Sequence, residues 1–287
     1  MEISLTATVA SIAFCVPASA VGEVHRDLEF AKVDGHSLKL DLYLPEKSTK
    51  PAPLLIYVHG GAWRAGSKEN PPIAALTEKG FALASVDYRL TTVAPFPANV
   101  HDIKAAIRFL RAHAGEFGCD PKRFVITGSS AGGHLAALVG VSNGHKELEG
   151  EVGEHRGVSS DVQAIVSFFG AANLQTILGQ STPHGISVRV PALQLLLGGQ
   201  PGEKPALAKL ASPVAHVDAH DPPLLLIHGD ADPQMPIEQS RELQAAYQKA
   251  KRPVQFVVLP GSVHGGKEFY DASRLAIVQE FLDKHLR

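Results

Sequence analysis

The sequence predicts one α/β domain with an eight-stranded, mostly parallel sheet and helices on both of its faces. From about residue 24 to the C-terminus, short apolar runs alternate with segments of helical periodicity. No Ser/Gly-rich stretch, charge block or repeat interrupts this alternation. Hydrophobic residues make up 45% of the 287 positions, which is enough for a sizeable core. This layout is typical of a doubly wound sheet, where ligands bind at the carboxyl ends of the strands.

Eight segments have the character of strands. Residues 37–45, SLKLDLYLP, alternate apolar and polar side chains, as a half-exposed strand does. Residues 54–60, LLIYVHG, form a continuous apolar run that ends in glycine, which indicates a buried parallel strand. The other expected strands span residues 28–33, 81–89, 123–130, 164–170, 223–230 and 254–261.

Helices are expected between most of these strands. Pro97 begins one of them, because apolar residues recur after it at helical spacing and form one stripe. These residues are Val100, Ile103, Ile107, Leu110 and Ala114. The small-residue segment AGGHLAALVG directly follows the strand at 123–130, and further helices start near Pro236 and Lys267.

Residues 171–210 break this rhythm. They contain Gly, Pro and a run of leucines but no clear strand. We interpret the segment as a lid-like excursion over the strand ends. An ordinary crossover helix with long loops is the alternative, and the two descriptions are compatible.

The first twenty residues differ in character from the rest. An apolar stretch from Leu5 to Val16 precedes Ala18-Ser19-Ala20, which predicts a signal peptide of residues 1–20 cleaved after Ala20. The folded domain would then be residues 21–287, and the protein secreted or periplasmic. Against this, the segment carries Glu2 and no Lys or Arg. An N-terminal helix or strand packed on the domain is the alternative, with a cytoplasmic protein.

Composition excludes several partner classes. The net charge is -2 with both signs dispersed, so neither nucleic acid nor an anionic membrane is expected as a partner. The apolar stretch at the N-terminus is too short to span a bilayer. Of the two cysteines, Cys15 lies in the predicted signal, which leaves Cys119 without an internal disulfide partner. We expect Cys119 to be a small, partly buried thiol in a loop.

The strongest chemical signal is the G-x-S-x-G segment Gly128-Ser129-Ser130-Ala131-Gly132. An apolar strand precedes it and a helix follows, which is the context that this motif requires. A side chain at the apex of such a strand-to-helix turn adopts strained backbone angles and needs small neighbours. The glycine spacing centres on Ser130 rather than Ser129. Ser130 is therefore the predicted nucleophile, exposed at a helix N-terminus that favours negative charge.

A serine nucleophile needs a histidine base that a carboxylate orients. In this strand–turn–helix context the partners follow in the order Ser, Asp or Glu, His. His264 follows the last predicted strand in a glycine-rich turn, PGSVHGG. Asp230 ends the strand at 223–230 and Asp232 follows it, and their spacing of two does not distinguish them. Asp230 could equally cap the turn.

His59-Gly60-Gly61-Ala62-Trp63 lies at the carboxyl end of the strand at 54–60. Paired glycines let backbone N–H groups approach a substrate carbonyl and stabilise an oxyanion. The predicted donors are Gly60, Gly61 and Ala131, the last by its place after the nucleophile. Trp63 is predicted to bind substrate by lining the acyl or alcohol pocket, with core packing as the alternative.

No cofactor or metal is expected. The chain has no H-E-x-x-H, cysteine cluster, P-loop or G-x-G-x-x-G after a first strand. His216 and His220 are four residues apart, but they lie in a loop with no evident third ligand.

Taken together, HGGAW, SVDYRL, the phrase RFLRAHAGEFGCDPKR, GSSAGGHLAALVG, LLIHGDADPQMP and GSVHGG resemble the esterase/lipase branch of the α/β-hydrolases. Within it, the chain is similar to bifunctional feruloyl and acetyl xylan esterases and to hormone-sensitive-lipase-like carboxylesterases, over residues 28–286. The resemblance implies a sheet in which only the second strand is antiparallel. It also implies that Asp232 is the carboxylate of the triad and that Gly60, Gly61 and Ala131 form the oxyanion hole.

Two positions depart from the pattern. The lipase-like group has a third glycine where Ala62 stands, which favours the xylan-esterase or formamidase variant. Met235 replaces the usual valine, which is expected to reshape the alcohol side of the pocket.

The expected function is a serine esterase acting through an acyl-enzyme on acetyl or feruloyl esters of plant cell-wall oligosaccharides. The substrate is then a small-molecule or oligosaccharide ester. The alternatives are a general short-chain carboxylesterase, an arylformamidase or peptidase, and a non-catalytic binding protein with this fold. Neither the substrate nor the oligomeric state follows from fold.

Overall fold

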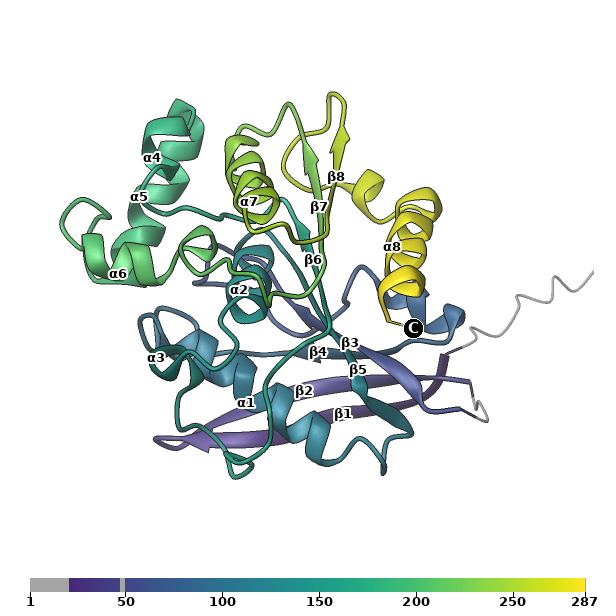
Figure 1. Cartoon of the computed structure of the whole chain (residues 1–287). Coiled ribbons are helices and arrows are strands. Elements are labelled where there is room, and N and C mark those ends of the chain that lie inside the picture. Colours follow the sequence, from purple (N-terminus) through teal and green to yellow (C-terminus); the bar gives the residue numbers. More distant parts are fainter. Residues whose placement is uncertain (1–20, 47–49, 287) are drawn as a thin grey trace, which may run out of the picture.

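All eight predicted strands are present in the computed structural model, which describes residues 21–46 and 50–286 (Figure 1). β1 begins at Val21 rather than at residue 28, and the others shift by a few residues at their ends. The strands are β1 (Val21–Val33), β2 (His36–Pro45), β3 (Ala52–Val58), β4 (Ala82–Val86), β5 (Cys119–Ser129), β6 (Ala164–Phe168), β7 (Leu224–Gly229) and β8 (Val254–Leu259).

The strands form one sheet in the order β1-β2-β4-β3-β5-β6-β7-β8. β2 is antiparallel to both of its neighbours, β1 and β4. Every other pair is parallel, from β4 across to β8. The register between β1 and β2 shifts at three places, so β1 is an irregular edge strand. The predicted α/β-hydrolase sheet, with only its second strand antiparallel, is confirmed.

Helices fill the connections between the parallel strands. The expected helix after Pro97 is α1, and the small-residue helix after β5 is α2. The helices are α1 (Ala98–Ala112), α2 (Ala131–Gly140), α3 (Lys146–Glu149), α4 (Ile177–Gln180), α5 (Pro183–Leu197), α6 (Pro205–Leu210), α7 (Glu238–Lys249) and α8 (Ala272–His285). Three 3₁₀ turns are η1 (Ala74–Lys79), η2 (Pro213–Ala215) and η3 (Lys267–Phe269).

The sheet separates two hydrophobic cores because successive side chains of a strand point to opposite faces. In β3, Leu54 and Ile56 join the core that includes α1 and α2. Leu55 and Tyr57, which alternate with them, join the core that includes η1 and α8. Figure 1 shows this division at the far end of the sheet, where α7 and α8 lie on opposite sides of β7. Burial on both faces explains the continuous apolar runs of the central strands.

Residues 171–210 contain the helices α4, α5 and α6, as the alternative of a helical crossover expected (Figure 1). Thr182 caps α5 by accepting a hydrogen bond from the Gly185 amide, and Gly198 ends the helix in the left-handed conformation. The Thr182 hydroxyl also donates to the Pro233 carbonyl in the turn after β7. At its other end, the Leu196 carbonyl accepts a hydrogen bond from the Phe96 amide. The segment therefore joins loops at the carboxyl edge of the sheet and contributes one side chain to the site described below.

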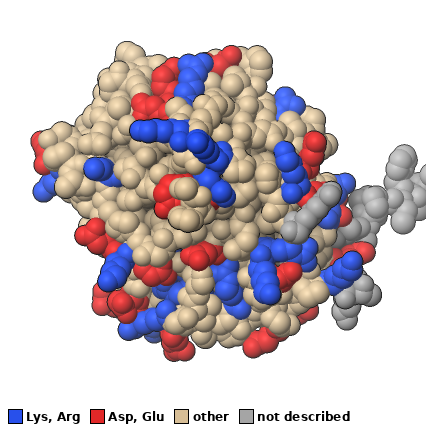
Figure 2. All heavy atoms as spheres, viewed as in Figure 1, with Lys and Arg blue, Asp and Glu red and all other residues tan. Residues whose placement is uncertain are grey.

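Charged side chains of both signs lie interspersed on the face seen in Figure 2, in line with the net charge of -2. Across residues 21–46 and 50–286, no helix is long and apolar enough to cross a membrane. The predicted signal peptide of residues 1–20, with Cys15, lies outside the described residues. Cys119 is free and starts β5 instead of lying in a loop, and it is almost fully buried. Burial raises the pKa of its thiol to about 12.

Candidate active site

Ser130 is the single residue between the end of β5 and the start of α2. Its backbone angles, φ 56° and ψ −119°, lie in a region that non-glycine residues rarely adopt. The strand before it and the helix after it hold this conformation, as the motif predicts. The side chain therefore projects from the carboxyl edge of the sheet.

The flanking glycines are required by close backbone packing. A Cβ at Gly128 would lie 2.4 Å from the Gly132 carbonyl oxygen. A Cβ at Gly132 would lie 2.0 Å from the Val58 carbonyl oxygen and 2.5 Å from that of His59. Since all three distances are well below van der Waals contact, any larger residue at either position would displace the turn.

His264 joins Ser130 to Asp232 by two hydrogen bonds. The Ser130 hydroxyl lies 2.8 Å from His264 Nε2, and His264 Nδ1 lies 2.6 Å from Asp232 Oδ2. Because a carboxylate only accepts hydrogen bonds, Nδ1 carries the proton and Nε2 is free to accept from serine. The Phe169 ring packs edge-on against the imidazole, with 4.9 Å between centroids. The structure thus brings together three residues that are 32 to 134 positions apart in the chain.

Asp232 is held in its ionised form. Burial opposes ionisation, but hydrogen bonds from His228 and His264 and from the Met235 amide outweigh it and hold the pKa of the carboxyl well below its ordinary value. Its Oδ1 accepts from the amides of Gln234 and Met235, both at 2.8 Å. Asp232 is therefore a fixed anion that orients the imidazole.

Asp230 has a different position. Its Oδ1 accepts a hydrogen bond from the Gly261 amide at 2.6 Å, so it joins the turn after β7 to the turn after β8. The geometry therefore distinguishes Asp232 from Asp230, which their spacing in the sequence does not. Ser129 is likewise separated from the histidine, because its hydroxyl lies 2.5 Å from the Tyr270 hydroxyl.

His228 was not anticipated from the sequence. It is fully buried, its Nε2 donates to the Met235 carbonyl at 3.0 Å, and its Nδ1 accepts from the Ser240 hydroxyl at 2.8 Å. The same Nε2 lies 3.4 Å from Asp232 Oδ2. His228 therefore fixes the turn that carries Asp232. The only sequence signal was its place two residues before the first aspartate.

Gly60, Gly61 and Ala131 lie around the serine with their amides unused. A Cβ on Gly60 would be 3.4 Å from Ser130 Cβ, so the two backbones are adjacent. Gly61 has φ 99°, and its carbonyl accepts hydrogen bonds from Arg64 and Ala65, which closes the turn. In the part of the chain that the structure describes, none of the three amides donates a hydrogen bond. Such free donors can stabilise an oxyanion without prior reorganisation.

Trp63 does not line the cavity, so the prediction that it binds substrate is wrong. The side chain is fully buried, and its Nε1 donates to His134 Nδ1 at 3.0 Å. His134 Nε2 in turn donates to the Ala211 carbonyl. The indole therefore packs beneath the loop at Gly60 and supports it from the core, which was the alternative interpretation.

The cavity at Ser130 has a volume of about 450 Å³. Besides the serine, the histidine and the two glycines, it is lined by side chains that the sequence did not single out. These are Arg64, Phe169, Arg189 and Gln234. Arg189 comes from α5, so the helical segment between β6 and β7 does contribute to the site.

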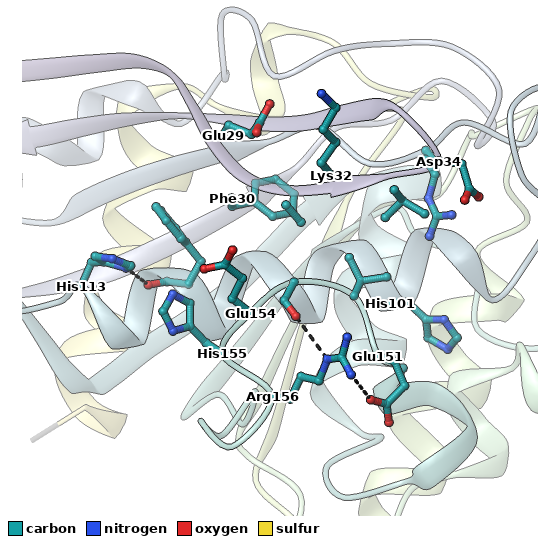
Figure 3. Close-up of a pocket in the computed structure, with 17 residues that line it drawn as sticks. Glu29, Phe30, Lys32, Asp34, His101, His113, Glu151, Glu154, His155 and Arg156 are labelled. Carbon is teal, nitrogen blue, oxygen red and sulfur yellow. Dashed lines mark hydrogen bonds and ion pairs between the residues drawn. The ribbon is translucent and has the colours of Figure 1, made fainter.

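A larger cavity of about 990 Å³ lies elsewhere, between β1, α1 and residues 150–156 (Figure 3). Its lining contains no Ser, Thr or Cys side chain. Several of its polar groups bond to one another or to backbone, such as Arg156 with Glu151 at 3.1 Å and His113 with the Phe109 carbonyl at 2.8 Å (Figure 3). Its lining therefore lacks a hydroxyl or thiol nucleophile comparable to Ser130.

No cluster of three or more His, Cys, Asp or Glu side chains among residues 21–46 and 50–286 is arranged to hold a metal ion. His216 donates from Nε2 to the Leu210 carbonyl at 2.7 Å.

Known proteins with similar sequences include esterases. The chain is 34% identical over 221 residues to esterase LipC of Mycobacterium tuberculosis, covering 76% of this chain and 54% of that protein. It is 30% identical over 240 residues to the isoprenylcysteine alpha-carbonyl methylesterase ICME of Arabidopsis thaliana, covering 79% and 53%. The chain spans about half the length of these curated relatives.

Solved structures resemble it over almost the whole chain. A truncated carbohydrate esterase from gut microbiota superposes with a TM-score of 0.85 at 32% identity, covering 93% of this chain and 97% of that one. The propionate-bound esterase Est2 of Thermogutta terrifontis gives 0.73 at 29% identity, covering 93% and 94%. The family model BD-FAE matches residues 40–247. The chain thus belongs to the BD-FAE family and has the α/β-hydrolase fold of these esterases.

Proposed function

We propose that this chain is a serine esterase that hydrolyses carboxylic esters through an acyl-enzyme. The observation that carries the proposal is the continuous hydrogen-bonded series from Ser130 through His264 to Asp232, beside amides without acceptors. The names of the similar proteins, all esterases, support the same reaction.

The geometry supports a familiar sequence of proton transfers. Ser130 Oγ attacks the ester carbonyl while His264 Nε2 takes its proton over the 2.8 Å hydrogen bond. Asp232 stabilises the imidazolium through Nδ1. The amides of Gly60 or Gly61 and of Ala131 stabilise the oxyanion. The imidazolium then protonates the leaving alcohol, and water releases the acyl group by the same steps with His264 again as base.

We further propose acetyl or feruloyl esters of plant cell-wall oligosaccharides as substrates. The family and the carbohydrate esterase among the similar structures support this choice. The open cavity of about 450 Å³ has room for a small acyl group and part of a sugar.

The decisive experiment compares the protein with its Ser130→Ala variant. Both are incubated with acetylated and feruloylated xylo-oligosaccharides and with 4-nitrophenyl acetate and butyrate. We expect the variant to lose at least about 10³-fold in kcat, because nucleophile and base act as a unit. A fluorophosphonate probe should label the unsubstituted protein at Ser130.

Each outcome has a definite meaning. Release of acetate or ferulate at rates comparable to the aryl esters supports the oligosaccharide substrates. Hydrolysis of aryl esters alone indicates a general carboxylesterase. Absence of both hydrolysis and labelling would refute the proposal and favour a binding protein, whereas labelling without ester hydrolysis would direct attention to amide substrates.

A further inference from the structure

A buried arginine with unused donors lies beside Ser130. Arg189 of α5 is 1% exposed and lines the same cavity as Ser130 and His264. A guanidinium has five N–H donors. Among the described residues, Arg189 makes one hydrogen bond, from Nη2 to the Gln234 carbonyl at 2.9 Å. Its Nε is buried without a partner, so most of its donor capacity is unused.

The charge of Arg189 is also left without an ion pair in residues 21–46 and 50–286. The carboxylate that acts on it electrostatically is Asp232. The oxygens of that carboxylate are already engaged by the Gln234 and Met235 amides and by His264. Burial lowers the pKa of Arg189 to about 10, and Asp232 opposes this shift. The side chain is therefore a cation at neutral pH.

The rest of the cavity adds positive charge. Arg64 lines it as well, and its side chain makes no hydrogen bond or ion pair within the described part of the chain. No Asp or Glu side chain lines the cavity. Two cations therefore line the space next to the nucleophile, and no acidic side chain lines it with them, in a protein whose overall charge is slightly negative.

Such an arrangement does not favour folding by itself. A buried charge loses its hydration, and only a partner of opposite charge with good hydrogen-bond geometry offsets that loss. A carboxylate would satisfy Arg189, because its two oxygens match the planar fork of a guanidinium. Residues 21–46 and 50–286 supply no carboxylate that pairs with Arg189, so we look to a ligand for it.

We propose that Arg189, assisted by Arg64, binds a carboxylate carried by the substrate, so that the preferred ester is anionic. This inference rests on the proposed esterase function and specifies its substrate class. A uronic acid residue near the esterified sugar would place the carboxylate on the alcohol side. A dicarboxylic acid half-ester would place it on the acyl side. The chemistry at Arg189 is the same in both cases.

Two pairs of matched esters distinguish the two sides. The alcohol-side pair is 4-acetoxybenzoate and 4-acetoxybenzamide. The acyl-side pair is 4-nitrophenyl hydrogen adipate and the 4-nitrophenyl ester of adipic acid monoamide. Within each pair the shapes are nearly equal and only the charge differs, so the ratio of kcat/KM between the members measures recognition of the anion.

Arg189→Met should reduce that ratio by about 10- to 100-fold in at least one pair, which is the contribution expected of a charged hydrogen-bonded contact. Most of the change should appear in KM, and the neutral esters should retain their kcat/KM within about 3-fold. Arg189→Lys should restore part of the preference, because it keeps the charge without the fork. Arg241→Met is the matched control, since Arg241 is exposed and paired with Glu238.

A binding measurement separates this inference from catalysis. Calorimetric titration of Ser130→Ala with intact 4-acetoxybenzoate and with the adipate half-ester gives dissociation constants without turnover. Adding Arg189→Met to this variant should weaken binding of at least one anion by 10-fold or more and leave the neutral amides unchanged.

Two results would overturn the inference while leaving the esterase intact. The first is that neither pair shows a preference for the anionic ester and that Arg189→Met does not change the ratio of kcat/KM. The other is an equal loss on neutral and anionic esters, which would make Arg189 a structural residue. If no ester is hydrolysed at all, the proposed function fails, and the titration still decides whether Arg189 binds a carboxylate.

Discussion

Two arginines are buried to the same degree, yet their surroundings differ. Arg108 on α1 and Arg189 on α5 are each 1% exposed, and each has an Nε without a partner. Arg108 forms an ion pair with Glu149 and donates to the Val152 carbonyl. Lys104 also contacts Glu149, at 3.0 Å. Arg189 forms no ion pair within the described part of the chain, and Asp232 acts on it only through its charge. The comparison shows that this chain neutralises a buried cation where the cation is structural and leaves one unpaired beside the proposed nucleophile.

Removing the anion from the first region should have the largest effect. Glu149→Gln removes the carboxylate that contacts both buried cations, Lys104 and Arg108, so we expect the free energy of unfolding to fall by about 3 kcal/mol. The melting temperature should fall by roughly 6–12 °C, with kcat/KM on neutral esters changed less than about 3-fold. Scanning calorimetry and an ester assay measure both. A melting temperature within 2 °C of the original would mean that the pair is not structural.

A buried group that stays neutral provides the next test. His134 is fully buried between Trp63 and Ala211, and its pKa is lowered to about 4, mainly by burial and also by the charge of Arg189. Because the unfolded chain binds this proton near pH 6.5 and the folded chain near 4, the free energy of unfolding falls as the pH drops through that window.

His134→Gln removes this titration. The variant should be less stable than the original protein at pH 8. The difference in free energy of unfolding between the two proteins should narrow by about 2 kcal/mol between pH 7 and 4.5. Urea unfolding at several pH values measures it, and other groups cancel because they titrate alike in both proteins. If the difference in free energy of unfolding did not change with pH, the lowered pKa of His134 in the folded protein would be contradicted.

The smallest expected effect is the change in stability when Arg108 or Arg189 is replaced by methionine. Arg108→Met should lower the free energy of unfolding by about 1 kcal/mol, since Glu149 keeps Lys104 as a partner. Arg189→Met should leave the melting temperature unchanged or slightly raised, because it removes a buried charge that forms no ion pair among the described residues. Parallel thermal scans decide this, and a clear destabilisation by Arg189→Met would show that the two regions are alike.

The strands and Ser130 could be predicted because their signals are local. A strand buried on both faces appears as an apolar run, and the turn at Ser130 needs glycines at fixed spacing. His264 and Asp232 required the order of motifs along the chain and, for the aspartate, a family resemblance. Their mutual geometry rests on loops that meet only after folding.

Arg189 could not be predicted in this way. It lies in a helix whose periodicity is weak, and its neighbour Gln234 is 45 residues away. The residues that line a cavity from a crossover segment depend on how that segment packs, which no local spacing encodes. The prediction that Trp63 binds substrate is wrong for a related reason. Its place after two glycines indicates proximity to the site, but the direction of its side chain depends on His134, 71 residues further on.

The irregular edge strand β1 has a consequence for behaviour at high concentration. An exposed, regular edge can accept a strand from another molecule and begin aggregation. β1 changes register between Val21 and Val24, His25 and Leu28, and Glu29 and Ala31, and Asp27 has φ 55°. These bulges interrupt the row of backbone groups that a second molecule would need. We expect this edge to resist intermolecular strand addition, which favours recovery of the protein from concentrated solutions.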